Sequence, residues 1–195
     1  MRCLNDDFQA NSVFYIFNHA TDDQLLFYDD QDYEFFLIAL GKQLDNIPAS
    51  IIAFCLMPNH YHFLIRQDSE SKIYKIFNYA FVSYARYYNR KYERKGHIFR
   101  SPLQHKKVSN QLYLIQLCKY IHLNPVYAGL VEEPEEWEYS NYKKWINQRD
   151  ELFFTKEIRN KYFHNTDDYI LFLNSLQNFI KHGTFIDIIT TDNIS

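Results

Sequence analysis

The stretch Ala49–Gln67, ASIIAFCLMPNHYHFLIRQ, decides the fold because it holds two apolar runs separated by a short turn. Residues 49–56 are rich in β-branched and aromatic side chains and predict a strand, and residues 60–67 alternate in polarity and predict another. Met57, Pro58 and Asn59 between the runs have the composition of a tight turn. We therefore expect the two strands to pair as an antiparallel hairpin.

The segments on either side of this hairpin are predicted to form further strands and helices. We expect a strand over 13–18, helices over 30–46 and 71–91, an extended piece over 98–108, and a helix that starts at Ser109 or Asn110 and ends at Leu123. The last helix is expected to end there because Asn124 precedes Pro125, and proline pushes the preceding residue out of helical space. This order predicts an α+β fold, an antiparallel sheet with its helices on one face and the other face open for a ligand.

The chain of 195 residues is long enough to bury one sizeable core, which we assign to residues 1–148. From Asp150 onward the sequence carries 4 basic and 7 acidic residues and no motif that bears chemistry. Residues 149–195 are therefore expected to form a mostly helical C-terminal extension.

Composition excludes several classes of protein. All four glycines are isolated, which excludes a dinucleotide fingerprint, a P-loop and a nucleophile elbow. The three cysteines are odd in number and widely spaced, which argues against a disulfide framework or a CxxC zinc site. The sequence shows no signal segment and no apolar run near the ~18 residues of a membrane span. We expect a cytoplasmic protein with no membrane partner.

The formal net charge of -3 hides a segregation of charge along the chain. Between residues 86 and 107 eight Lys or Arg residues stand against one acid, and tyrosines interleave with them. Such a segment combines phosphate neutralisation with flat stacking surfaces, as single-stranded nucleic-acid binders require. The alternative is a solvated helix face whose tyrosines pack inward. The eight residues are Arg86, Arg90, Lys91, Arg94, Lys95, Arg100, Lys106 and Lys107.

His60 and His62 stand two residues apart in the second strand of the predicted hairpin. Alternate residues of a strand point to the same face, so the two imidazoles could hold one metal ion while Tyr61 and Phe63 turn to the core. Taken alone, two histidines on a strand are more often surface or core residues than metal ligands.

The predicted helix after Asn110 carries a buried stripe of apolar residues and, about 100° around its axis, a second stripe. The second stripe is Tyr113, Gln116, Tyr120 and Asn124. The amide oxygen of Asn124 is a hard ligand suited to Mg²⁺ or Mn²⁺, and it lies one turn from Tyr120. Tyr120 is thus a candidate nucleophile, although a tyrosine on a helix usually serves packing.

Longer motifs occur in a fixed order along the chain. They are LMPNHYHFL at 56–64, YARYYN at 84–89, GHIF at 96–99, KYIHLNPVYAGL at 119–130 and WEYSNY at 137–142. Together they resemble the single-tyrosine HUH transposases, specifically the REP-associated tyrosine transposase branch of the IS200-like family. The resemblance covers residues 12–145, and several motifs in order are far more specific than one HxH pair.

This resemblance implies that His60, His62 and Asn124 hold a divalent metal, Mg²⁺ or Mn²⁺. It implies that Tyr120 is the nucleophile of an enzyme that cuts and rejoins single-stranded DNA near short hairpins, through a 5′-phosphotyrosine. The implied fold is a ferredoxin-like or RRM-like antiparallel sheet, with residues 1–148 as the catalytic domain. His105 joins the candidate DNA contacts because it lies with Lys106 and Lys107 where relatives also have basic residues.

Two other classes of protein remain as alternatives. One is a nucleic-acid-binding module that has lost catalysis and only grips structured single strands. The other is a hydrolytic metalloprotein in which the histidines bind Zn²⁺ and Tyr120 only packs, which would need a further nitrogen, sulfur or carboxylate ligand. A monomer and a homodimer are both compatible with the sequence.

Overall fold

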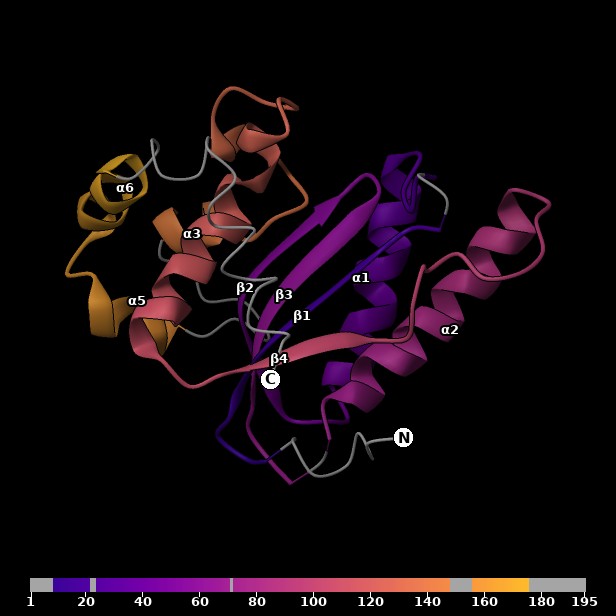
Figure 1. Cartoon of the computed structure of the whole chain (residues 1–195), viewed down its shortest axis with the longest axis horizontal. Coiled ribbons are helices and arrows are strands. Elements are labelled where there is room, and N and C mark those ends of the chain that lie inside the picture. The colour runs from indigo at the N-terminus through magenta and orange to yellow at the C-terminus, as the bar shows by residue number, and fades with distance from the viewer. Residues whose placement is uncertain (1–8, 22–23, 71, 148–155, 176–195) are drawn as a thin grey trace, which may run out of the picture.

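The computed structural model describes residues 9–21, 24–70, 72–147 and 156–175 of the chain. Figure 1 shows a central sheet between two groups of helices. The sheet is antiparallel and its four strands are β1 (Val13–His19), β2 (Ala49–Met57), β3 (His60–Gln67) and β4 (Gln104–Val108). Their spatial order is β2-β3-β1-β4. The α+β fold predicted from the sequence is confirmed.

The β2–β3 hairpin forms as expected, with only Pro58 and Asn59 left between the strands. The strand β3 lies in the middle of the sheet, where it pairs with β2 on one side and β1 on the other. In the register with β1, His62 stands opposite Phe17 and His60 stands opposite His19. The two histidines are therefore held by strands on both sides.

The helices α1 (Asp30–Leu44) and α2 (Tyr74–Lys91) pack side by side on one face of the sheet. Asp29 caps the start of α1 because its side chain accepts a hydrogen bond from the backbone N–H of Asp32. The space between these helices and the sheet is filled mainly by aromatic and aliphatic side chains, which we call the first core cluster. Its fully buried rings include Phe36, Phe63, Phe77 and Tyr84.

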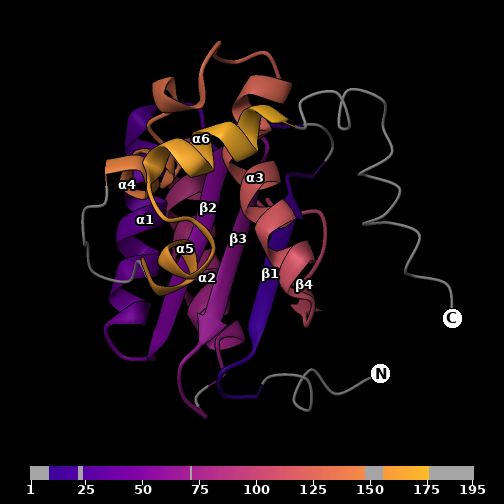
Figure 2. The same ribbon diagram turned by 90° about the vertical axis from the view of Figure 1, so that its left-hand side faces the viewer.

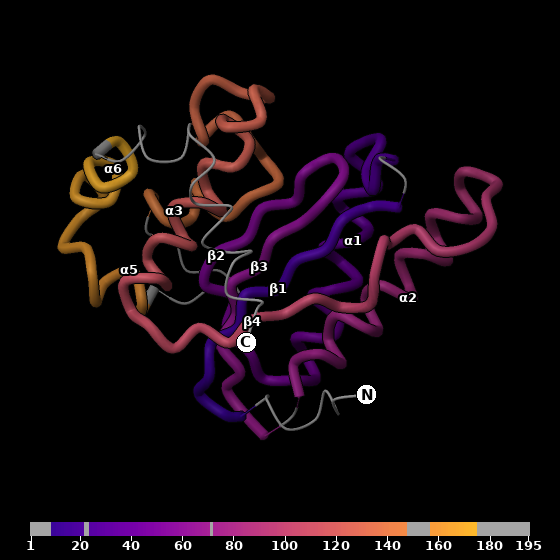
Figure 3. Tube along the Cα trace, viewed as in Figure 1, coloured from indigo at the N-terminus to yellow at the C-terminus, as the bar shows by residue number. Residues whose placement is uncertain are grey.

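The helix α3 (Gln111–Tyr127) packs on the opposite face, so the prediction of helices on one face only is wrong in this respect. The reason lies in β2, where eight of nine residues are buried and neighbours point alternately to the two faces. Phe54 belongs to the first core cluster, whereas Ala53 and Cys55 join α3 residues in a second core cluster. A strand that is apolar on both faces needs cover on both. Figure 3 follows the chain from α2 along β4 into α3.

The helix α3 also continues beyond its predicted end at Leu123. Asn110 caps its start by accepting hydrogen bonds from the N–H groups of Leu112 and Tyr113, as expected. The helix then runs through the buried Pro125 to Tyr127, because packing of this turn outweighs the lost backbone hydrogen bond. It ends where Gly129 adopts φ +68 and donates to the carbonyl of Val126. Asn124 is therefore an interior helical residue.

The described part of the C-terminal extension is helical. It forms α5 (Lys156–Tyr162) and α6 (Thr166–Ser175), whereas the 3-10 helix η1 (Pro134–Glu136) and α4 (Tyr142–Asn147) precede the extension. Figure 2 shows α6 on the outer side of α3 with the sheet behind them, and Tyr169 and Leu173 of α6 are buried in the second core cluster. The predicted boundary at 148/149 and residues 176–195 lie outside the described residues.

No helix among the described residues combines the length and the apolar character needed to cross a bilayer.

Candidate active site

His60 and His62 point from β3 toward α3, and both rings direct Nε2 at the side chain of Asn124. His60 Nε2 lies 3.2 Å from Asn124 Oδ1, and Asn124 Nδ2 donates to His62 Nε2 at 3.3 Å. His62 is 3% exposed, whereas Tyr61 and Phe63 belong to the first core cluster on the other face. The structure thus brings together two histidines from one strand and the amide of Asn124, which lies 64 and 62 residues after them in the chain.

The other nitrogen of each imidazole also has a partner. His62 Nδ1 lies 2.7 Å from the hydroxyl oxygen of Tyr15 on β1, and His60 Nδ1 lies 2.6 Å from Asn59 Oδ1. The ring of His19 stacks on His60 with centroids 4.9 Å apart. Sequence patterns alone do not single out Tyr15 or His19, because their proximity to the site depends on the register of β1 against β3. Asn59 directly precedes His60 in the chain.

Both imidazoles are neutral at physiological pH. Burial lowers the pKa of His60 to about 4, with a further contribution from His19 and an opposing one from the hydrogen bond to Asn124. Burial, together with His60 and His19, holds the pKa of His62 well below its usual range. Neutral imidazoles have a free lone pair, which is the state that binds a metal.

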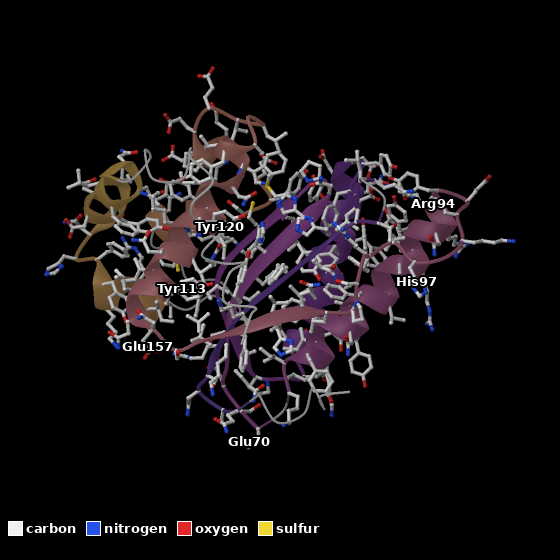
Figure 4. The ribbon with its side chains drawn as sticks, viewed as in Figure 1. Glu70, Arg94, His97, Tyr113, Tyr120 and Glu157 are labelled. Carbon is white, nitrogen blue, oxygen red and sulfur yellow. The ribbon has the colours of Figure 1, made fainter. Side chains whose placement is uncertain are left out.

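Tyr120 lies on α3 one turn before Asn124, and its ring meets His62 edge-on with centroids 5.3 Å apart. Figure 4 shows Tyr120 on α3 above Tyr113. Burial raises the pKa of Tyr120, and a hydrogen bond to Asn124 acts in the opposite direction. The phenol is therefore protonated at neutral pH, and it must lose its proton during any attack.

The donor set fits a hard divalent cation. An octahedral shell with bonds of about 2.1 Å places neighbouring ligand atoms about 3 Å apart, which is close to the 3.2 Å between His60 Nε2 and Asn124 Oδ1. The described residues contain no group of three or more His, Cys, Asp or Glu side chains able to hold a metal ion. The candidate donors are two imidazole nitrogens and one amide oxygen. The zinc alternative requires a further nitrogen, sulfur or carboxylate ligand, and the described residues place none in a group with these histidines.

The predicted basic segment is divided by the fold. Lys91 Nζ lies 2.6 Å from Asp29 and 2.8 Å from the buried Asp32, so its charge is already neutralised. Arg94 contacts the hydroxyl of Tyr88 at 3.3 Å, and Figure 4 shows Arg94 on the opposite side of the molecule from Tyr120. The exposed Arg86 and Arg90 lie on α2, which covers the other face of the sheet.

Two basic residues of the segment lie nearer the histidines. The exposed Arg100 donates its backbone N–H to the carbonyl of His19, and after burial its charge is the second cause that lowers the pKa of His19. Lys106 of β4 stands opposite Tyr15, and its Nζ lies 5.4 Å from the ring centroid of Tyr113. Arg100 and Lys106 therefore contact residues that lie beside the candidate site.

Known structures resemble this fold. A solved structure of the REP-associated tyrosine transposase bound to a REP hairpin matches with a TM-score of 0.60 and 15% identity, over 77% of this chain and 89% of that one. A transposase structure from Deinococcus radiodurans matches with a TM-score of 0.41 and 15% identity, over 59% of this chain and 92% of that one. No curated protein matches the chain.

The family match supplies the classification. The family described as "Transposase IS200 like" matches residues 23–124, just over half of the 195-residue chain. The matched stretch begins before α1 and ends at Asn124, so it includes His60, His62 and Tyr120. This protein therefore belongs to the IS200-like transposase family.

Proposed function

We propose that this transposase cleaves and rejoins single-stranded DNA beside hairpins, with a divalent metal and a 5′-phosphotyrosine intermediate. The observation that carries the proposal is the convergence of His60, His62 and Asn124, with Tyr120 one helical turn away. A nucleophile beside a set of hard-metal ligands is the arrangement that phosphoryl transfer needs.

His60 and His62 would hold Mg²⁺ or Mn²⁺ through Nε2, and Asn124 through Oδ1. The cation would polarise a non-bridging oxygen of the scissile phosphate and orient it for in-line attack. Tyr15 and Asn59 occupy the opposite nitrogens of the two rings and keep the rings from turning away.

Tyr120 would form a bond from its hydroxyl oxygen to phosphorus while the bond from phosphorus to the 3′ oxygen breaks. The phenol proton passes to solvent, and the leaving oxygen takes up a proton to become a free 3′-hydroxyl. The products are a 5′-phosphotyrosine and a new strand end. Attack by another 3′-hydroxyl reverses the step and joins the strands, so no nucleotide is consumed.

Two observations support DNA as the partner. The structural neighbour with a TM-score of 0.60 is bound to a REP hairpin, and Arg100 and Lys106 border the histidine face of this chain. The outer basic residues would meet the DNA farther from the scissile bond, and we leave Lys91 out because two carboxylates neutralise it. These outer residues are Arg86, Arg90, Arg94, Lys95, His105 and Lys107. The reaction would take place in the cytoplasm.

A covalent-adduct gel tests this function. The full chain is incubated with Mg²⁺ or Mn²⁺ and labelled hairpin DNA from the flanks of its own gene, and the mixture is run under denaturing conditions. We expect a labelled protein band that requires metal and is absent in Tyr120→Phe. Tyr113→Phe, two turns earlier on α3, is the matched control and should still form the adduct.

The outcomes separate the alternatives. An adduct that persists in Tyr120→Phe would reject this nucleophile. Binding of the hairpins without an adduct, in the presence of either Mg²⁺ or Mn²⁺, would reject strand transfer and favour a module that binds DNA without cleaving it.

A further inference from the structure

The hydroxyl of Tyr15 occupies a position behind the proposed metal centre. Tyr15 is 2% exposed, its hydroxyl lies 2.7 Å from His62 Nδ1, and its ring runs nearly parallel to the imidazole at 11° with centroids 5.8 Å apart. Phe17, two residues later on β1, stacks on the ring of Tyr15 with centroids 4.9 Å apart. The hydroxyl is thus held in place by the packing of its own ring.

The tautomer of His62 decides whether this residue can be a ligand. A neutral imidazole carries one N–H, so Nε2 offers a lone pair only when the proton resides on Nδ1. Asn124 Nδ2 already donates to His62 Nε2 at 3.3 Å, which requires the lone pair there. The Nδ1 proton then needs an acceptor inside the protein, and the hydroxyl oxygen of Tyr15 lies at hydrogen-bond distance from that nitrogen.

We infer that Tyr15 is a positioning residue that holds His62 as the Nδ1–H tautomer, with its Nε2 lone pair directed at the metal centre. This inference rests on the proposed function, since it concerns a ligand of the proposed metal. Without the hydroxyl, a buried N–H would lose its acceptor in the tautomer that binds metal, and that tautomer would become less favourable. Partners of this kind behind a metal ligand change metal affinity by about 10 to 100-fold.

The test measures Mn²⁺ affinity of the full chain by electron paramagnetic resonance. Tyr15→Phe removes the hydroxyl and keeps the ring, and we expect it to weaken Mn²⁺ binding by about 10 to 100-fold. Tyr61→Phe is the matched control, because Tyr61 is also fully buried on the sheet but belongs to the first core cluster on the other face. It should bind Mn²⁺ like the wild type. Equal binding by wild type and Tyr15→Phe would overturn the inference and leave the metal centre intact.

A second measurement is independent of metal and of how well the variant folds. Nitrogen-15 NMR of the metal-free wild type distinguishes the two imidazole tautomers of His62. The Nδ1–H form is expected, and the Nε2–H form would overturn the inference. A wild type that shows the Nδ1–H form but binds no Mn²⁺ would reject the proposed metal centre and support the role of Tyr15 in orienting His62.

Discussion

The two faces of the sheet hold their helices in different ways. On the face of α1 and α2 the core is built mainly from stacked aromatic rings, such as Phe36 against Phe81 with centroids 5.9 Å apart. On the face of α3 several polar side chains are buried and bonded. These are His62, Lys119, His122, Asn124 and Asn141.

The buried polar residues bind α3 on both of its sides. Toward the sheet, Asn124 contacts the two histidines of β3. Toward α6, His122 Nδ1 lies 2.6 Å from the Tyr169 hydroxyl, and Lys119 Nζ donates to the carbonyl of Phe172 at 3.0 Å. Apolar packing tolerates small shifts, whereas hydrogen bonds have narrow limits of distance and angle. On this face directional bonds from α3 reach the sheet at the candidate active site, whereas on the other face Lys91 of α2 is bonded to Asp29 and Asp32 at the start of α1.

Phe63 and His62 are neighbours on β3 that point to opposite faces of the sheet, so substitutions at these positions test the two faces separately. We expect Phe63→Ala to lower the free energy of unfolding by about 3–5 kcal/mol through a cavity in the first core cluster. His62→Leu should reduce adduct formation by more than about 100-fold, because it removes a proposed metal ligand rather than one of that ligand's partners. Urea unfolding and the adduct gel measure both variants.

The two effects should be separable. Phe63→Ala should keep its metal-dependent adduct at a temperature where it remains folded, and His62→Leu should lose less stability than Phe63→Ala. If His62→Leu forms the adduct as the wild type does, the assignment of chemistry to the α3 face is wrong.

The contribution of Lys119, a buried residue on the α3 face, to the free energy of unfolding is expected to depend on pH. Lys119 is fully buried, and burial lowers its pKa to about 8 in the folded protein, against about 10.4 for an unperturbed lysine. Between these values the unfolded chain binds more protons, so the contribution of Lys119 makes the folded state more stable as pH rises. Lys119→Met, which removes the buried charge, should be more stable than wild type at pH 7, and the difference should shrink from about pH 8 to about pH 10.

Urea unfolding of both proteins across this pH range measures the difference. Lys143→Met is the control, because Lys143 is exposed and its substitution removes a surface charge rather than a buried one. A difference between Lys119→Met and wild type that stays constant with pH would contradict a buried ammonium at position 119.

The smallest expected effect concerns the basic residues. Arg100→Ala should weaken binding of single-stranded DNA and reduce the slope of log affinity against log salt by about 0.7, the value for one phosphate contact. Lys91→Ala should leave that slope unchanged, because Lys91 is paired with Asp29 and Asp32. Fluorescence anisotropy at several salt concentrations distinguishes the two. A reduced slope in Lys91→Ala would show that its ion pairs open for DNA.

The sequence predicted the strand β3 at its observed bounds and the start of α1 at Asp30, since both depend on local alternation and capping. It could not predict that Lys91 is neutralised, because Asp29 and Asp32 lie about 60 residues earlier in the chain. It also missed Tyr15, one of 17 tyrosines, which nothing in its local sequence distinguishes. What set these residues apart was contact between distant segments.

The sequence by itself determined which residues share a face. The two-residue period of a strand places His60 and His62 together, and the four-residue spacing on a helix places Tyr120 beside Asn124. Only the tertiary structure decided that α3 covers the histidine face and brings Asn124 within 3.3 Å of both imidazoles. That choice follows from burial, because β2 is apolar on both faces and needs a helix on each. Local periodicity fixes the direction of a side chain, whereas the balance of buried surface over the whole chain fixes what that side chain meets.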